Sequence, residues 1–326
     1  NGSIMDKLIS FSLPLMLSGI LQLMFNAVDI VVVGRFSGSQ ALAAVGSTSA
    51  LINMFTNLFI GVSLGANVLA ARFYASGRSK EMSETVHTSI TFALISGIVM
   101  VFVGLFFSRF ALELMATPSD VIEQAALYMK IYFLGMPFFM LYNYGAAILR
   151  AVGDTKRPLF FLIAAGLINA GLNMILVIVF HMGVAGVAIA TVISQFVSCV
   201  LVLRCLYQSD SSYQLRFSKL TLKKNHLKQI FQVGIPAGIQ STVINFSNVL
   251  LQSSVNSFGS IAMAGYTAAN NIFGFLFVAV NSVTQACMSF TSQNFGVGKW
   301  KRMDKVLWNC IILSVIVAVL LGGGAY

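Results

Sequence analysis

Charged side chains are scarce in this sequence, and two long stretches have none. Only 9% of its 326 residues are Asp, Glu, Lys or Arg, whereas 57% are hydrophobic. No charged residue lies between Lys228 and Lys299, or from Pro158 to Leu203. Each stretch is long enough for two membrane spans, because one span needs about 20 apolar residues. The composition excludes a soluble globular domain and indicates a polytopic membrane protein.

Cysteines and catalytic motifs are also few. The 4 cysteines show neither metal-ligand spacing nor a framework of disulfide pairs, so they are interpreted as small apolar residues. There is no zinc-protease motif, Walker loop or Ser-His-Asp set. We therefore expect no enzyme, no catalytic residues and no cofactor. The three histidines lie at segment ends and are expected at the membrane interface: His87, His181 and His226.

The hydropathy pattern predicts an all-α protein with spans at 8–33, 47–70, 86–108, 120–149, 158–180, 183–206, 230–256, 267–295 and 306–326. Basic residues fill alternate loops, whereas the opposite loops hold only Arg35 and Arg109. This is the positive-inside pattern, so the amino terminus is expected in the cytoplasm and the protein in the cell membrane. The same pattern accounts for the net charge of +10 without a nucleic-acid partner. Lys130 lies inside the fourth span and so does not fit this loop pattern, and its role stays open.

An internal repeat organises the chain. A shift of 222 residues aligns Pro14 with Pro236, and a shift of 221 aligns the segments 77–82 and 298–303 at Gly, a basic residue and Met. Six predicted spans separate the copies, so both enter the membrane in the same direction. Two six-helix lobes related by a pseudo-two-fold axis along the membrane normal are therefore expected.

The expected domains are an amino-terminal lobe at 1–206, a cytoplasmic linker at 207–229 and a partial carboxyl-terminal lobe at 230–326. The second lobe would hold helices 7 and 8 and most of helix 9. A complete second copy would end near residue ~450 if the repeat keeps its period. We therefore expect the sequence to be truncated at its carboxyl end.

Asp29 is the only carboxylate well inside a predicted span, at 13–34. A carboxyl group in hydrocarbon costs several kcal/mol unless it is protonated, paired or facing a wet cavity. Asp29 therefore indicates an ion or proton site. The alternative is a protonated side chain that only bonds a neighbouring helix. Under the repeat Asp29 aligns with Leu251, and the seventh span has no acid, so the charge chemistry is expected in the first lobe.

Two later spans bring polar side chains to the depth of Asp29. Asn169 and Asn173 share one helix face, as do Thr191 and Gln195. At ~1.5 Å per residue, Asp29, Asn173 and Thr191 lie about 12 Å below the outer surface. A carboxylate with amide and hydroxyl oxygens suits Na⁺, while the carboxylate alone can carry a proton. The alternative is interhelical hydrogen bonding, worth about 0.6–2 kcal/mol each.

Three segments resemble the MATE (multidrug and toxic compound extrusion) transporters. They are SLPLMLSGILQLMFNAVDIVVVGRFSGSQALAAVG at 12–46, ILRAVGDTKRPL at 148–159 and the NxxxN pair at 169 and 173. The resemblance implies a bacterial, two-lobed antiporter of twelve helices that exports organic cations in exchange for H⁺ or Na⁺. Carried over by motif, the cation or proton site is Asp29, Asn169, Asn173 and Thr191, with Asn26 and Gln195 as accessory candidates.

Two departures from the family pattern bear on the ion. Some members carry Asp where this chain has the neutral Asn173, so the choice between H⁺ and Na⁺ stays open. One branch carries a glutamate where this chain has Ile244, so the resemblance implies coupling through the first lobe.

Three functions compete at this point. The first is an antiporter for amphipathic, cationic small molecules that works as a monomer in the lipid bilayer. The second is a lipid-linked saccharide flippase of the same superfamily, which would need basic residues in its cavity to hold pyrophosphate. The third is a membrane receptor or structural protein without transport, which would need neither the repeat nor a buried acid.

Overall fold

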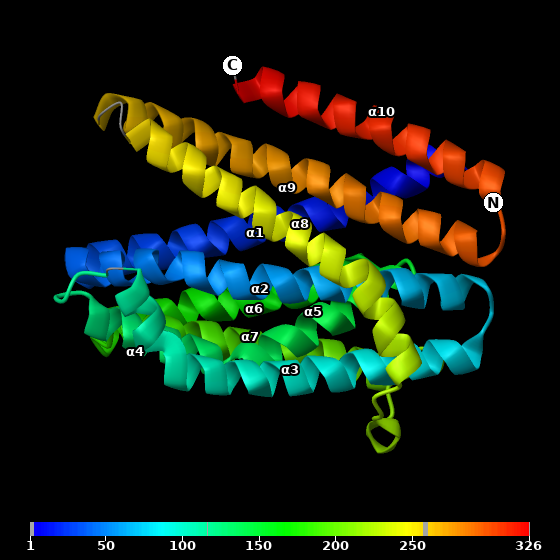
Figure 1. Ribbon diagram of the computed structural model, residues 1–326, viewed down its shortest axis with the longest axis horizontal. Coiled ribbons are helices and arrows are strands. Elements are labelled where there is room, and N and C mark those ends of the chain that lie inside the picture. The colour runs from blue at the N-terminus through cyan, green and yellow to red at the C-terminus, as the bar shows by residue number, and fades with distance from the viewer. Residues whose placement is uncertain (1–2, 116, 257–259, 326) are drawn as a thin grey trace.

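The structure is a computed structural model that describes residues 3–115, 117–256 and 260–325. Its helices run along one long axis, with α9 and α10 on one side of α1 and α2 and with α3 to α7 on the other (Figure 1). They are α1 (Ile4–Phe36), α2 (Gly38–Ala75), α3 (Ser79–Leu114), α4 (Ile122–Leu134), α5 (Met136–Ala151), α6 (Lys156–Asn173), the π-helix η1 (Met174–Val179), α7 (Gly183–Tyr207), the 3-10 helix η2 (Phe217–Lys219), α8 (Lys224–Asn256), α9 (Ser260–Gly296) and α10 (Trp300–Ala325).

Each predicted span lies on helices of this set. In the described residues, 7 helices are long and apolar enough to cross a membrane, and the bent pair α4 and α5 adds an eighth span; α8, which holds the predicted span 230–256, is not among them. Gly135 and Pro137 interrupt the fourth span, a pattern that predicts a kink. The structure confirms it: α4 ends before Gly135, Pro137 lies in the first turn of α5, and the two helices meet at 47°. The molecule is thus an all-α, multi-pass membrane protein.

The repeat extends to the geometry of its turns. Gly77 between α2 and α3 has a φ of 69°, and Gly298 between α9 and α10 has a φ of 68°, values that favour glycine. The N–H of Arg78 donates to the carbonyl of Phe73 at 3.1 Å, and the N–H of Lys299 donates to the carbonyl of Asn294 at 3.0 Å. These bonds join residues at the predicted shift of 221, so the two turns are copies of one structure.

One buried hydrogen bond marks the relation between the lobes. The hydroxyl of Ser289 in α9 donates to Oδ1 of Asn67 in α2 at 2.9 Å, and the two residues lie 222 positions apart. That separation differs by one residue from the shift of 221 that relates the ends of these two helices. A residue that contacts the neighbour of its repeat equivalent must lie close to the pseudo-two-fold axis. The Asn67 amide also donates to the carbonyl of Ala147 at 2.8 Å, so the axis is tied to α5 of the first lobe.

Glycines bring the backbones of α2 and α8 into contact, and the sequence interpretation missed this. The segments GVSLG at 61–65 and GIPAG at 234–238 face each other where the helices cross (Figure 1). A Cβ placed on Gly61 would lie 2.3 Å from the Cα of Gly238, and one on Gly234 would lie 2.5 Å from the Cα of Val62. Such GxxxG pairs are a common device for close helix packing in membranes. The lobes therefore meet backbone to backbone along α2 and α8.

The segment between α7 and α8 is pinned to α3. The ring of His87 is 2% exposed and uses both nitrogens: Nδ1 donates to the carbonyl of Ser83 at 2.6 Å, and Nε2 accepts from the N–H of Arg216 at 3.1 Å. The N–H of Lys223 donates to Oγ1 of Thr88 at 3.2 Å. His87 is therefore buried beneath the connecting segment, and its depth at the membrane interface stays a prediction.

The glycine contact predicts a position-dependent effect of one methyl group. Gly61→Ala forces the α2 and α8 backbones apart and should cost about 1–3 kcal/mol of stability by overpacking. Gly46→Ala, in the same helix, meets no atom within 4 Å and should be neutral or slightly stabilising. Thermal unfolding of the purified protein in detergent compares the two. Equal melting temperatures for both variants would refute a tight α2–α8 contact.

Candidate ion site in the first lobe

Asp29 lies in α1, about two turns of helix before the turn that joins α1 to α2, and its side chain is partly buried. Nδ2 of Asn173 donates a hydrogen bond to Oδ1 of Asp29. Asn173 is the last residue of α6 and is fully buried. The bond also fixes the orientation of the amide, because a carboxylate accepts hydrogen bonds and would repel the amide oxygen.

A chain of hydrogen bonds continues from Asn173 into α7. The same Nδ2 lies 3.2 Å from Oδ1 of Asn169, and Nδ2 of Asn169 lies 3.4 Å from Oγ1 of Thr191. The Thr191 hydroxyl donates to the carbonyl of Val187 at 2.9 Å. The structure therefore brings four of the predicted site residues together from three helices, α1, α6 and α7.

The fifth span changes its helical geometry at the site. α6 ends at Asn173, and the next turn, Met174–Val179, is a π-helix. Wider π turns are frequent at functional sites because they shift a side chain and release backbone groups. The sequence interpretation missed this turn, since an apolar run such as MILVIV reads equally well as α-helix.

One polar atom at the centre of the site lacks a partner. Oδ1 of Asn173 is buried, and no described residue forms a hydrogen bond with it. Buried oxygen atoms are nearly always hydrogen-bonded, so this unpartnered oxygen near a carboxylate is expected to bind a hydrogen-bond donor or a cation. Asn173 therefore has one nitrogen that donates to Asp29 and one buried oxygen without a partner among the described residues.

The two accessory candidates lie outside the hydrogen-bonded chain. Asn26 is exposed on α1, one turn before Asp29. Gln195 lies against the α4–α5 bend, where a Cβ on Gly135 would come within 2.5 Å of its Oε1. That oxygen is buried without a hydrogen bond to any described residue. Gln195 thus provides a second buried oxygen without a hydrogen-bond partner, one helical turn from Thr191.

Two tyrosines of α4 join the site and were missed from the sequence. Tyr128 and Tyr132 are close enough to Asp29 for its charge to act on their hydroxyls, and the Tyr132 side chain also faces Gln195. Their i, i+4 spacing in the fourth span matches that of the Asn pair and was the available signal. The fourth span therefore contributes two tyrosines to the surroundings of Asp29.

The site has no fixed counter-charge. Among the described residues, Asp29 forms no salt bridge, and the five ion pairs all lie near the ends of the helices. In the described part of the chain, no three His, Cys, Asp or Glu side chains gather as a metal site. A carboxylate held by one amide in an apolar bundle can be neutralised by a proton or by a small hard cation with oxygen ligands.

The comparisons with known proteins agree with this architecture. The MatE family profile matches residues 14–175 and 236–322. The Bacillus subtilis "Probable multidrug resistance protein YoeA" is 31% identical over 316 residues, which cover 94% of this chain and 68% of that protein. The Thermotoga maritima "Probable multidrug resistance protein NorM" is 27% identical over 333 residues, with 98% and 69% covered. This chain thus spans about two thirds of the length of these relatives.

Solved structures show the same fold. A multidrug resistance MATE family transporter of the MOP superfamily in an outward-facing conformation superposes with a TM-score of 0.91 at 22% identity, covering 97% of this chain and 70% of that one. A MATE structure in the bent conformation gives a TM-score of 0.90 at 22% identity, covering 97% and 71%. With the profile match over most of the sequence, these findings show that the chain belongs to the MATE family of membrane transporters.

Proposed function

We propose that the protein is a secondary active antiporter that exports amphipathic, cationic organic compounds in exchange for H⁺ or Na⁺. The observation that carries this proposal is the lone carboxylate of Asp29, bonded to Asn173 and without a counter-charge. Loading and release of the ion at Asp29 would change the charge of the first lobe. A ligand shifts a conformational equilibrium only through different affinities for the two states, and a buried charge supplies that difference.

The relatives support the transport part of the proposal. YoeA and NorM are named as multidrug resistance proteins, and the Staphylococcus aureus relative MepA is named as a multidrug export protein. Export of varied amphipathic compounds suits a bundle whose interior is apolar and which carries 27 Phe and 9 Tyr. The single negative charge at Asp29 favours cations among those compounds.

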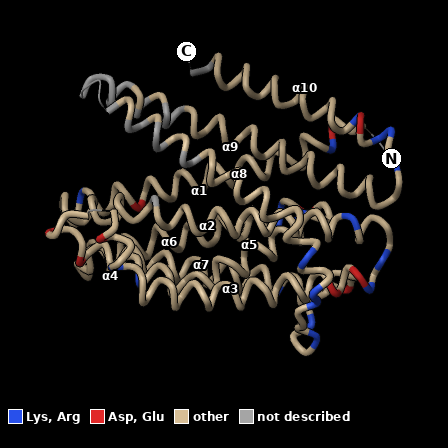
Figure 2. The backbone as a smooth tube through the Cα atoms, in the orientation of Figure 1, with Lys and Arg blue, Asp and Glu red and all other residues tan. Residues whose placement is uncertain are grey.

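The orientation in the membrane is part of the same proposal. Lys and Arg residues gather mainly at the end of the bundle that holds the amino terminus and the segment before α8 (Figure 2). By the positive-inside rule this end, with the amino terminus and the linker, faces the cytoplasm. Asp29 then lies in the outer half of the membrane, so its ion would exchange with the outside when the lobes open outward.

The two ions make different demands on the site. A proton needs only an Asp29 oxygen, whereas Na⁺ needs several oxygens at once. The free Oδ1 of Asn173 and, further along the hydrogen-bonded chain, the hydroxyl of Thr191 would serve as additional ligands. Neither ion calls for a further cofactor.

A lipid-linked saccharide flippase would need cations in its cavity to bind a pyrophosphate group. Lys130, inside the fourth predicted span, is the candidate for this role, and its position does not support it. Lys130 is half-buried on α4 between Leu127 and Leu134, which are 46% and 47% exposed. These neighbours place it toward the lipid-exposed side of the helix, where a long side chain snorkels to the interface.

Asp29→Asn should reduce gradient-driven export to the rate of protein-free vesicles. The change keeps the shape of the side chain and its bond from Asn173, so the protein should still fold and reach the membrane. Efflux of a fluorescent lipophilic cation from proteoliposomes, with pH and Na⁺ gradients imposed separately, provides the measurement. Asp120→Asn, at an exposed carboxylate in the α3–α4 connection, is the matched control and should retain full activity. Normal export by Asp29→Asn would rule out Asp29 as the coupling group.

Asn173→Asp should change the pH dependence of transport. The substitution removes the amide that donates to Asp29 and places a second carboxylate in contact with it. Two acids in contact cannot both ionise cheaply, so the pair should hold a proton at higher pH than Asp29 alone. The activity–pH profile should therefore move to higher pH, while Asn294→Asp on α9 should leave it in place. An unmoved profile in a correctly folded variant would show that Asn173 only packs.

A further inference from the structure

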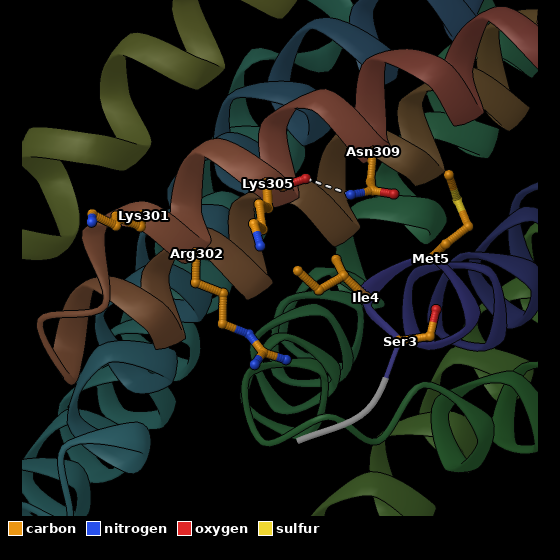
Figure 3. Close-up of a pocket in the computed structure, with 7 residues that line it drawn as sticks. All are labelled: Ser3, Ile4, Met5, Lys301, Arg302, Lys305 and Asn309. Atoms are coloured by element: carbon orange, nitrogen blue, oxygen red, sulfur yellow. Dashed lines mark hydrogen bonds between the residues drawn. The ribbon is translucent and has the colours of Figure 1, made fainter.

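A basic cavity lies where the first turn of α1 meets the start of α10 (Figure 3). Its volume is about 480 Å³, within the range of ligand pockets. The walls are Ser3, Ile4 and Met5 from α1 and Lys301, Arg302, Lys305 and Asn309 from α10. Figure 3 shows the side chains of Arg302 and Lys305 extending into the space beside α1, whereas Lys301 lies at the edge.

None of the three basic residues of this cavity forms an ion pair with a carboxylate of the described chain, and the carboxylates next to them in the sequence are Asp304 on α10 and Asp6 on α1. The Asn309 amide donates to the carbonyl of Lys305 at 2.6 Å and holds that turn in place. Ser3 caps α1 and accepts from the N–H of Asp6 at 3.4 Å, so the positive end of a long helix adds to the field.

The repeat shows what occupies the corresponding place in the first lobe. A shift of 221 matches Arg302 with Glu81, Lys305 with Glu84 and Asn309 with Thr88, and a shift of 222 matches Ile4 with His226. In the first lobe, Oε2 of Glu84 lies 3.7 Å from Nδ1 of His226. The cavity is therefore the second-lobe copy of the contact between α3 and the start of α8.

In the first lobe that contact is filled by the chain itself. The segment before α8 lies on α3, with Nζ of Lys223 at 3.9 Å from Oε1 of Glu84 and the Lys223 N–H bonded to Thr88. There the acidic side chain of Glu84 contacts the basic segment before α8. On α10 the acidic residues of α3 are replaced by Arg302 and Lys305, which would repel a basic segment. These two cations therefore favour an anion.

The depth of the cavity suits a lipid headgroup. Trp300 and Trp308 on α10 are 59% and 64% exposed, and exposed tryptophans gather at the membrane–water interface. Both residues lie within two turns of Arg302 and Lys305 along the helix. The cavity therefore opens at the level of the phosphate groups of one leaflet, at the end of the bundle rich in basic residues (Figure 2).

We propose that this cavity is a phosphate site that binds the headgroup of an anionic phospholipid. Arg302 and Lys305 donate to the phosphate oxygens, Lys301 adds charge at the rim, and the first turn of α1 contributes its dipole. The bound lipid joins α1 of the first lobe to α10 of the second, as the segment before α8 joins α8 of the second lobe to α3 of the first. The site acts independently of the ion at Asp29.

The test measures lipid retention by native mass spectrometry after reconstitution in phosphatidylcholine with added phosphatidylglycerol. The wild-type protein should retain phosphatidylglycerol in preference to phosphatidylcholine. The double variant Arg302→Gln/Lys305→Gln should bind it roughly tenfold less, since each basic residue near the surface contributes to binding. Lys219→Gln/Lys224→Gln removes the same charge from exposed positions at the same end and should retain lipid like the wild type.

The outcomes separate the sources of phosphate. Inorganic phosphate should compete only weakly, because it lacks acyl chains; if it binds to wild-type protein and phosphatidylglycerol does not, the lipid assignment is wrong. Equal retention by the two double variants, or equal retention of both lipids by the wild type, would overturn the site.

Unchanged thermal unfolding of Arg302→Gln/Lys305→Gln in phosphatidylcholine alone shows that the variant is folded. If the double variant does not fold, the single variants Arg302→Gln and Lys305→Gln should each show a smaller loss, and no loss in either would equally overturn the site.

Discussion

The rest of this structure depends on how one carboxylate is held in an apolar bundle. Asp29 has an amide donor, Asn173, but no cationic partner in the described chain. Hydrocarbon makes an unpaired charge costly, so the site is stable only with a bound proton or cation, or when water reaches it. Neutral amides and hydroxyls make that binding reversible, whereas a fixed Lys or Arg would neutralise the site permanently. A carboxylate held in this way can take up and release an ion in each transport cycle.

The ion site and the contact between the lobes share a helix. α1 carries Asp29 and also packs against α9, where the rings of Phe11 and Phe290 meet edge to face at 5.4 Å. The other contact, between α2 and α8, is made by glycine backbones and has little freedom to repack. The α1–α9 contact is made by side chains, among them Val278 against Gly19. In our proposal the charge of Asp29 acts through α1 on this contact.

Sequence periodicity was enough for the features that depend on regular spacing. The spans, the bend at Gly135 and Pro137, and the meeting of Asp29 with Asn169, Asn173 and Thr191 all follow from helix rise and hydropathy. The π turn after Asn173 did not, because its apolar sequence fits either helix type. The contacts at Gly61 and Gly238 and the burial of His87 depend on which helices cross, which one sequence does not state. The i, i+4 spacing of Tyr128 and Tyr132 indicated that both lie on one helix face. Tyrosine is nevertheless common in membrane spans because of its apolar ring, so this spacing alone did not indicate a site.

The central claim is that Asp29 changes its protonation or ion occupancy during transport. Infrared difference spectroscopy of the reconstituted protein tests this most directly, because a protonated carboxyl group and a carboxylate absorb at different frequencies. The account predicts a carboxyl band that disappears as pH rises or as Na⁺ is added, and that is absent from Asp29→Asn. A spectrum in which no band assigned to Asp29 responds to either ion would contradict it.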